Sequence, residues 1–436
     1  MHLEVKKIDI LFFLNYTVGM LDIRETAYYN EESFSRRDYA DKLLSWQNQH
    51  VIKVITGVRR AGKSVVLRDF CKEISKFVSD EQITFLNFEM LENEDLLDYH
   101  ALYSALKNRL LPGAKNYILL DEIQLVENFE KVIDSLFVNP NVDIYLTGSN
   151  ANLLSSEIAT LLSGRYVELH VLPFSFREFQ NAYKAHFPEK NLDMPSLYTK
   201  FITFGGFPYL HNIYEHNENI RDYISGLYAT IVLKDIQQRK KISDTILLEK
   251  VVKFALAHTG NLLSPKKISD TFVSNGRKTA PSTVENCLNA LCESFLFYKL
   301  NRYDIKGKET LKTLEKYYAV DMGLKFFMLG ARGGNEGHVL ENVVFIELKR
   351  RGFDLFVGKF DDLEVDFVAV KDGKTHYVQV SLTVRDEETL RRELKPLYAI
   401  KDSFPKILIT MDNAPVVYHD GIKQLFALDF LNGAEL

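Results

Sequence analysis

The chain has 436 residues, of which 46% are hydrophobic, 26% are charged and 12% are aromatic. At this length we expect about three globular domains, and the hydrophobic content excludes a disordered chain. The 54 basic and 59 acidic residues give a net charge of -5. This balance excludes a uniformly basic nucleic-acid-binding surface, although a local basic patch is compatible with it.

The first residues of the chain include an apolar stretch at residues 8–20. It is too short to span a bilayer, and no small-residue cleavage site follows it. Three cysteines without metal-ligand spacing are typical of a reducing compartment. We therefore expect a cytoplasmic protein without a membrane segment, in which residues 1–23 form an N-terminal extension. Because Met20 ends the stretch, residues 1–19 fit either a native N-terminus or an extension from an earlier start codon.

An apolar, β-rich run at residues 51–56 leads directly into the sequence GVRRAGKS at residues 57–64. This matches the phosphate-binding pattern G-x-x-x-x-G-K-[ST] at every required position, and an amphipathic helix pattern follows it over residues 65–77. Backbone amides of such a loop bind phosphate oxygens. Lys63 neutralises β- and γ-phosphate charge, and the Ser64 hydroxyl is a magnesium ligand. The pattern therefore predicts binding of ATP with Mg²⁺. The residues expected to bind the nucleotide are Gly57, Arg60, Ala61, Gly62, Lys63, Ser64, Val65 and, from a later strand, Thr147.

A second apolar strand pattern, at residues 116–120, ends in two acids, Asp121 and Glu122. An acid at the tip of a buried strand is the Walker B pattern, in which Asp121 holds the magnesium shell. Glu122 follows by one residue and is placed to polarise the attacking water as a general base. The alternative, a solvated Asp-Glu pair at a strand end, has less support beside a phosphate-binding loop.

Further strand patterns complete the first region of the chain. They lie at residues 83–88, 142–146 and 166–172. A polar segment follows the second of them, and in it Thr147 or Asn150 is suited to orient the water or sense the γ-phosphate. Five strands separated by helical segments predict an α/β fold, a parallel sheet with helices on both faces. The extra strand before Walker B, together with Glu122, indicates the additional-strand, AAA-like branch of P-loop NTPases over residues 24–172.

Arg165 directly precedes the fifth strand pattern. A guanidinium at this place is a candidate arginine finger, acting either within the chain or from a neighbouring subunit. Arg59 and Arg60, inside the loop, are further cationic candidates. For each arginine the alternative is a surface position or a structural ion pair. An arginine that acts between subunits requires an oligomer, so the oligomeric state stays open.

Together these motifs resemble a family of prokaryotic AAA-superfamily ATPases whose members carry a C-terminal domain of unknown function. The resemblance extends from about residue 24 to the end of the chain. The motifs that carry it are GVRRAGKS (57–64), LDEIQ (120–124), LTGSN (146–150), SGRY (163–166), LPFSFREF (172–179), GGFP (205–208), DIKGK (304–308), KYY (316–318), EVDF (364–367) and YVQVS (377–381). The resemblance implies an ATPase domain followed by C-terminal domains whose biological role the family leaves mostly unassigned.

The middle of the chain reads as helical over residues 173–246 and as a winged helix over residues 247–330. Two helix patterns separated by a turn precede two strand patterns, with Lys306 and Lys308 between the strands. Such a module can place a helix in the major groove while cations of the wing contact phosphate. Residues 264–312 are therefore the candidate DNA-binding segment. Winged helices also serve as packing modules, so DNA and protein partners both stay open.

Residues 331–436 predict a C-terminal α/β domain similar to restriction endonucleases. Glu341 on a helix, Asp366 on a strand and Gln379 and Ser381 on the next strand follow the nuclease order. In that order the acids bind metal and a lysine positions the water. Here Ser381 stands at the lysine position, and Gln379 replaces one anionic ligand. We therefore expect a nuclease-like fold that is catalytically inactive.

The leading hypothesis is a Mg²⁺-dependent ATPase whose binding and hydrolysis of ATP to ADP change the conformation of C-terminal domains that bind DNA or protein. The alternative is a slow, nucleotide-gated DNA- or protein-binding switch, and an active nuclease is less favoured than either. We assign catalytic roles to Glu122, Lys63, Arg165 and Asn150. The expected metal ligands are Ser64 and Asp121.

Overall fold

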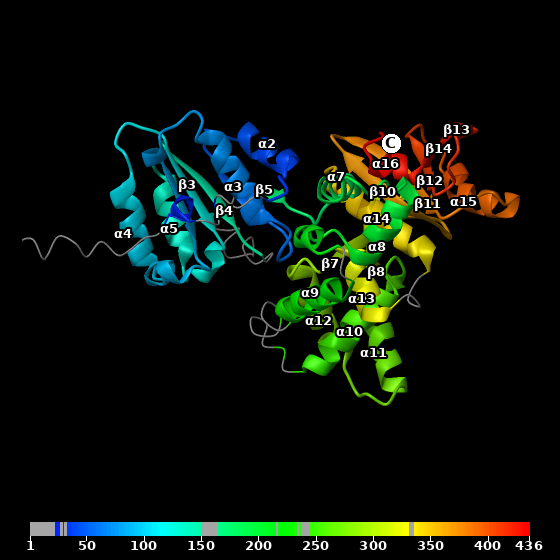
Figure 1. Ribbon diagram of the computed structural model, residues 1–436. Helices are drawn as coiled ribbons and strands as arrows, with labels where there is room; N and C mark the ends of the chain where they lie inside the picture. Colours follow the sequence, from blue (N-terminus) through cyan, green and yellow to red (C-terminus); the bar gives the residue numbers. More distant parts are fainter. Residues whose placement is uncertain are drawn as a thin grey trace, which may run out of the picture. The chain divides into compact units, whose positions relative to one another are not determined.

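The computed structural model describes residues 22–26, 29, 33–149, 164–214, 217–232, 236, 242, 244–330 and 335–436. The chain divides between Val171 and Leu172 into two compact units (Figure 1). Among the described residues, no helix combines the length and the apolar character that a bilayer-spanning segment needs.

A five-stranded parallel sheet forms the centre of the first unit, with the strand order β2-β3-β4-β1-β5. Every neighbouring pair of strands runs parallel. The strands are β1 (Ile52–Thr56), β2 (Ile83–Asn87), β3 (Asn116–Asp121), β4 (Val142–Thr147) and β5 (Tyr166–His170). The helices are α2 (Arg37–Ser45), α3 (Lys63–Ile74), α4 (Tyr99–Arg109) and α5 (Phe129–Phe137).

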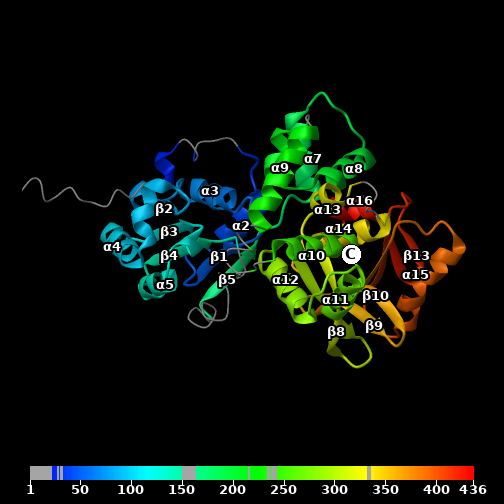
Figure 2. The ribbon, with the colours of Figure 1, turned by 90° about the horizontal axis from the view of Figure 1, so that it is seen from below.

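Helices cover both faces of this sheet (Figure 2). Leu102 of α4 and Ile133 of α5 belong to one core cluster with apolar side chains of β1, β3 and β4. On the other face Phe70 of α3 packs on Tyr145 of β4, with ring centroids 4.3 Å apart. A sheet covered on both sides needs strands that are apolar on both faces, and β1, β3 and β4 are buried along their whole length. The predicted parallel P-loop sheet with helices on both faces is confirmed.

The second unit begins with a helical region and continues into a mixed sheet. The helices are α7 (Phe176–His186), α8 (Met194–Phe204), α9 (Asn217–Ala229), α10 (Thr245–Ala257), α11 (Pro265–Ser274), α12 (Pro281–Glu293), α13 (Met322–Leu329), α14 (Glu336–Arg350), α15 (Glu387–Ala399) and α16 (Ala427–Leu431). Helices α10, α11 and α12 lie side by side next to strand β8 (Glu309–Ala319) in both ribbon views. The predicted order of a helical region followed by an α/β part is confirmed.

The sheet of the second unit has nine strands in the order β13-β14-β12-β11-β10-β9-β7-β8-β6. The strands besides β8 are β6 (Leu262–Leu263), β7 (Phe297–Asp304), β9 (Asp354–Phe360), β10 (Leu363–Lys371), β11 (Lys374–Ser381), β12 (Lys406–Thr410), β13 (Val417–His419) and β14 (Ile422–Phe426). Strand β7 pairs in parallel with β9. Residues 247–330 and 331–436, which the sequence suggests as separate domains, therefore contribute strands to one continuous sheet.

The C-terminal part of this sheet follows the order helix, three strands, helix, strand. Strands β9, β10 and β11 are antiparallel neighbours, and β12 joins β11 in parallel after α15. Phe345 of α14 contacts the ring of Phe367 on one face of β10. Leu394 and Leu397 of α15 belong to the core cluster of Val365 and Val368. Glu341, Asp366 and Gln379 consequently come from α14, β10 and β11, the order that the nuclease-like layout requires.

Candidate active site

A glycine-rich loop joins β1 to α3 at the carboxyl end of the sheet. Gly57 and Gly62 have φ values of 143° and 95°, which side chains strongly disfavour. A Cβ atom on Gly57 would lie 2.1 Å from the carbonyl oxygen of Val171, the residue that follows β5. Gly62 precedes the first turn of α3, so the amide groups of that turn have no side-chain cap from it. This cradle of backbone donors fits a phosphate group.

Lys63 is the first residue of α3, and its side chain is buried with 3% of its surface exposed. Its ammonium group donates to the carbonyl oxygens of Gly57 at 3.2 Å and Val58 at 3.3 Å. It also lies 3.6 Å from Oε1 of Glu122. The Lys63 ammonium group therefore lies over the loop, beside the place where it would neutralise phosphate charge.

Asp121 ends strand β3 and is fully buried. The Thr147 hydroxyl donates to its Oδ1 at 2.5 Å, and the Asn87 amide donates to its Oδ2 at 3.0 Å. Burial and the neighbouring charge of Glu122 raise the pKa of Asp121 to about 6. Hydrogen bonds from the Thr147 and Ser64 hydroxyls act in the opposite direction and lower this pKa. The predicted metal ligands Ser64 and Asp121 thus lie together, and Thr147 at the end of β4 contacts Asp121 at the end of β3.

Glu122 adopts a left-handed backbone conformation, with φ 55° and ψ 43°, which is costly for a residue other than glycine. Its N–H donates to the Thr147 hydroxyl at 2.9 Å, and the Gln124 amide donates to its Oε2. Burial works to raise the pKa of Glu122, but the Lys63 ammonium, the Gln124 amide and Arg59 together hold that pKa below its ordinary value. The carboxylate is therefore ionised and able to accept a proton.

Two further residues belong to this site, although the sequence did not identify either of them. Arg36, just before α2, is 1% exposed, and its guanidinium donates to the carbonyl oxygen of Ala61 at 2.5 Å. Asn87, at the carboxyl end of β2, contacts Asp121 as described above. The only sequence hint was a polar residue inside the apolar run of residues 83–88.

The arginines predicted from the sequence lie in different surroundings. Arg59 in the loop pairs with Glu89 at 2.5 Å, and Arg60 is exposed with a φ of 67°. Arg165 lies at the amino end of β5, where its carbonyl oxygen accepts from the amide of Ile52 at the start of β1. Its side chain pairs with Asp134 at 2.5 Å and is 49% exposed.

These contacts place Arg165 at the edge of the sheet opposite to the loop, because β1 and β5 are parallel. The structure therefore does not bring Arg165 to the phosphate site within the chain, and its role from a neighbouring subunit stays a prediction. Asn150, the other predicted sensor, lies outside the described residues.

The donor set fits a magnesium ion only when the ion shares its ligands with a nucleotide. Within the described parts of the chain, no cluster of three or more histidine, cysteine or carboxylate side chains is arranged to hold a metal ion alone. Magnesium in phosphate-loop sites is held by one or two protein oxygens together with phosphate oxygens and waters. Ser64 and Asp121 supply that number of protein ligands.

Residues 49–180 match the family described as an AAA domain, and residues 196–334 match a domain of unknown function, DUF8612. An uncharacterized protein of Haemophilus influenzae is 41% identical over 407 residues, which span 91% of this chain and 98% of that protein. Uncharacterized protein MJ1544 of Methanocaldococcus jannaschii is 32% identical over 382 residues, which span 84% of this chain and 81% of that protein.

Solved structures give weaker likenesses. The Walker-type ATPase PABY2304 of Pyrococcus abyssi matches with a TM-score of 0.47 and 16% identity, over 68% of this chain and 95% of that chain. The Orc1 protein of Aeropyrum pernix, solved in complex with DNA, matches with a TM-score of 0.32 and 11% identity, over 71% of this chain and 96% of that chain. At these TM-scores the likenesses support no inference about function.

Proposed function

This chain belongs to a family of AAA-type ATPases with a C-terminal domain of unknown function, and we propose that it is a Mg²⁺-dependent ATPase that couples its nucleotide state to the conformation of residues 172–436. One observation carries this proposal. Lys63 begins α3, whereas Asp121, Glu122 and Thr147 lie at the carboxyl ends of β3 and β4. Lys63 lies 3.6 Å from Glu122, the Glu122 amide donates to Thr147, and the Thr147 hydroxyl donates to Asp121.

Each of these side chains has a role that its position supports. Lys63 would bind the β- and γ-phosphates, since it begins the helix that follows the loop. Ser64 and Asp121 would hold magnesium, which when bound supplies positive charge to the phosphate oxygens. Glu122 would orient the attacking water and accept its proton, because it is ionised and lies one residue beyond the metal ligand.

The contact between Lys63 and Glu122 favours slow turnover of ATP in the absence of a partner. The Lys63 ammonium lies 3.6 Å from the Glu122 carboxylate, and the Gln124 amide holds the other carboxylate oxygen. Arriving phosphate would compete for Lys63 and free one side of Glu122. This arrangement also supports the second candidate function, a nucleotide-gated switch. Slow single-turnover hydrolysis together with nucleotide-dependent retention of DNA would favour the switch over the ATPase.

The experiment that tests the ATPase is phosphate release with purified full-length protein at saturating ATP, with and without Mg²⁺. We expect Lys63→Ala to lose nucleotide binding, and Glu122→Gln to keep binding while hydrolysis falls about 100-fold or more. Exposed Lys42→Ala on α2 is the matched control for loss of a lysine. Wild-type protein that releases no more phosphate with Mg²⁺ than both active-site variants do would contradict the proposal.

The segment after β5 supports coupling between the loop and the second unit. The N–H of Val171 donates to the carbonyl oxygen of Thr56 at 2.8 Å, and Gly57 packs against Val171 as described above. Only two residues later, the carbonyl oxygen of Pro173 accepts from Arg350 of α14 at 2.6 Å. The N–H of Phe174 donates to the carbonyl oxygen of Gly206 at 2.6 Å. A displacement of the loop by phosphate would therefore pull on a short stretch of chain that is anchored at both ends.

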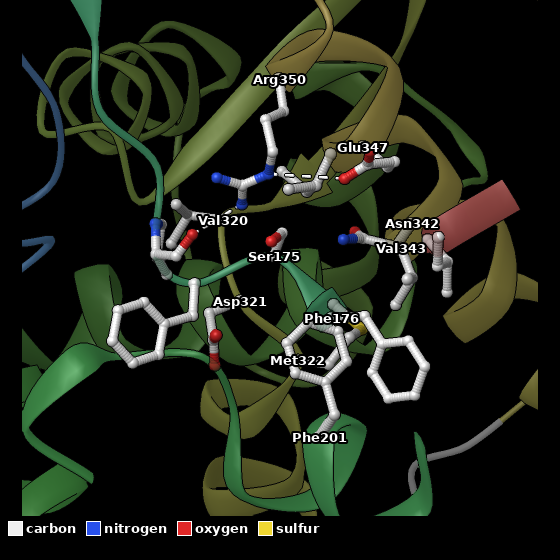
Figure 3. A pocket seen from close by; sticks show the side chains of 14 residues that line it. Ser175, Phe176, Phe201, Val320, Asp321, Met322, Asn342, Val343, Glu347 and Arg350 are labelled. Carbon is white, nitrogen blue, oxygen red and sulfur yellow. Dashed lines mark hydrogen bonds and ion pairs between the residues drawn. The ribbon is translucent and has the colours of Figure 1, made fainter. Parts of the chain in front are cut away.

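Pro173 and Phe174, which form these hydrogen bonds in the second unit, line a small cavity of about 30 Å³. Figure 3 shows that side chains of α7, α8, α13 and α14 line it, among them Phe176, Phe201, Met322 and Arg350. Arg350 pairs at 3.5 Å with Glu347, which lies one turn earlier on α14. A cavity of this size holds about two water molecules, so it leaves room for a small shift of residues 173–176 without a packing clash.

Hydrogen exchange of the Glu122→Gln variant with and without ATP tests the coupling. We expect ATP to change the exchange of amides in residues 172–178 and 205–207 as well as in the loop. A variant with normal ATP binding whose changes in exchange stop at residue 171 would contradict coupling and leave the ATPase proposal intact.

We also propose duplex DNA as the target of residues 264–312. Helices and strands α10, β6, α11, α12, β7 and β8 follow the order of a winged helix, and β8 pairs with both β6 and β7. Lys266 and Lys267 are exposed on the first turn of α11, although Arg277 and Lys306 are paired with Asp244 and Asp361.

Fluorescence anisotropy with a labelled duplex at two salt concentrations tests DNA binding. We expect Lys267→Glu to weaken binding about tenfold and to reduce its salt dependence, because phosphate contacts release counterions. Lys374→Glu changes an exposed lysine at the start of β11 and is the control of equal charge change. Wild-type protein without salt-dependent binding, in the presence or absence of ATP, would leave a protein partner as the remaining target.

A further inference from the structure

A buried lysine stands at the centre of the acidic cluster in the nuclease-like part of the second unit. Lys316 of β8 is 3% exposed, and its ammonium group lies 2.9 Å from Oε1 of Glu341, 2.9 Å from Oε1 of Glu364 and 3.5 Å from Oδ1 of Asp366. These carboxylates come from α14 and β10. An ammonium group has three N–H donors, so the three carboxylates use its full donor capacity.

The carboxylates of Glu341 and Asp366 also have other partners within the chain. The Tyr318 hydroxyl donates to Oε1 of Glu341 at 2.7 Å, and His338 lies 3.1 Å from its Oε2. The amide of Val380 donates to Oδ2 of Asp366 at 2.9 Å. The carboxylates that a nuclease would direct at a divalent metal are therefore satisfied by protein donors.

The two residues at the other nuclease positions point to the same conclusion. The Gln379 amide group donates to Glu393 at 3.0 Å, and its oxygen accepts from the backbone of Asp366 at 3.3 Å. The Ser381 hydroxyl donates to the carbonyl oxygen of Thr383 at 3.2 Å. Neither side chain supplies a metal ligand or a cation to the cluster.

We infer that the Lys316 ammonium is the permanent cation of this site, replacing a divalent metal and fastening strand β8 to α14 and β10. The charges support this arrangement. Burial opposes the charged form of Lys316, but the three carboxylates hold its pKa above the ordinary value. Burial and the charge of Glu341 raise the pKa of Asp366, which reduces the excess negative charge around a single ammonium group. The site is thus a metal-independent ion cluster that joins the β7–β8 hairpin to the C-terminal strands.

Calorimetric titration of Mn²⁺ into EDTA-treated, nucleotide-free full-length protein tests this inference. Wild type and Asp366→Asn should bind Mn²⁺ identically, because both share the first unit and neither has a metal site in the cluster. Lys316→Met should gain one Mn²⁺ site that is at least about tenfold tighter than any in wild type, since oxygen ligands become free. The double variant Lys316→Met/Asp366→Asn should lose it.

The comparison of wild type with Asp366→Asn does not depend on whether Lys316→Met folds. An additional Mn²⁺ site in wild type that Asp366→Asn removes would overturn the inference. Cleavage of DNA by wild type with Mn²⁺, abolished in Asp366→Asn, would overturn it as well. Unchanged thermal unfolding of wild type on addition of EDTA or Mn²⁺ would support it further.

Discussion

The substitution Thr147→Val removes one hydroxyl group from the meeting point of β3 and β4. This hydroxyl donates to Oδ1 of Asp121 at 2.5 Å and accepts from the amide of Glu122 at 2.9 Å. Valine keeps nearly the same shape and can do neither. Because Glu122 has a left-handed backbone, with φ 55°, the lost hydrogen bond also removes a contact that holds it in this conformation.

The size of the effect follows from these contacts. Leaving the buried Glu122 amide without a partner costs about 1–3 kcal/mol. If this cost appears entirely as a misplaced carboxylate in the transition state, kcat falls by about fivefold to 150-fold. If it destabilises the folded state instead, the free energy of unfolding falls by about 1–3 kcal/mol. The loss of transition-state stabilisation and the loss of folding free energy should therefore add up to about 1–3 kcal/mol.

Phosphate release and urea unfolding, measured on the same preparations, separate these outcomes. Thr147→Ser keeps the hydroxyl and should retain most of the activity. Thr84→Val removes a hydroxyl near the amino end of β2, opposite to the loop, and should leave kcat unchanged. The reasoning is refuted if Thr147→Val matches wild type in both measurements, or if Thr147→Ser is as impaired as Thr147→Val.

Three further predictions concern other parts of the chain. Arg36→Met removes a buried donor from the phosphate loop and should weaken ATP binding about tenfold in calorimetry, whereas exposed Arg37→Met should not. Gly206→Ala would place a Cβ atom 2.6 Å from the carbonyl oxygen of Phe174. It should lower the free energy of unfolding by about 1–3 kcal/mol in urea and abolish the ATP-dependent exchange change in the second unit. Burial raises the pKa of Asp321 from its ordinary 3.8 to about 6, so the folded state binds the proton more tightly than the unfolded chain. Its stabilising contribution is therefore full at low pH, and wild type should lose about 3 kcal/mol relative to Asp321→Asn as pH rises from about 4 to about 6. Parallel unfolding free energies of the two proteins across this range would contradict the last prediction.

The phosphate loop and the Walker B acids were predictable because their signals are local. Residues 57–64 define the loop within eight consecutive positions, and an apolar run identifies the strand before Asp121. In a parallel sheet the carboxyl ends of the strands share one edge. The meeting of Lys63, Asp121 and Thr147 could therefore be inferred without knowing any distance between them.

The same rule shows why Arg165 was misjudged as a candidate within the chain. A residue that precedes a strand lies at the amino edge of a parallel sheet, opposite to the loop. The order of Arg165 and β5 in the sequence already contained this information, and the parallel pairing of β5 with β1 makes it explicit.

Contacts between distant segments could not be predicted in this way. Arg36 lies 25 positions before Ala61, and Lys316 lies 25 positions before Glu341 and 50 before Asp366. No periodicity or motif links such positions in one sequence. Two strand patterns were predicted after the helices, but the contact of Lys316 with α14 and β10 follows only from the pairing of β7 with β9.

Two of the lysines that are buried in the described part of the chain, Lys63 and Lys316, illustrate how the number of partners decides whether an ammonium group is exchangeable. Lys63 has one carboxylate at 3.6 Å and two neutral carbonyl oxygens, and it begins the helix that follows the glycine-rich loop. A phosphate group offers several charged oxygens at once, so it can replace all three contacts of Lys63. Lys316 has three carboxylates, two of them at 2.9 Å, and moving it would leave buried negative charges without a partner. The first ammonium group is therefore suited to respond to a ligand, and the second is suited to hold a fixed structure.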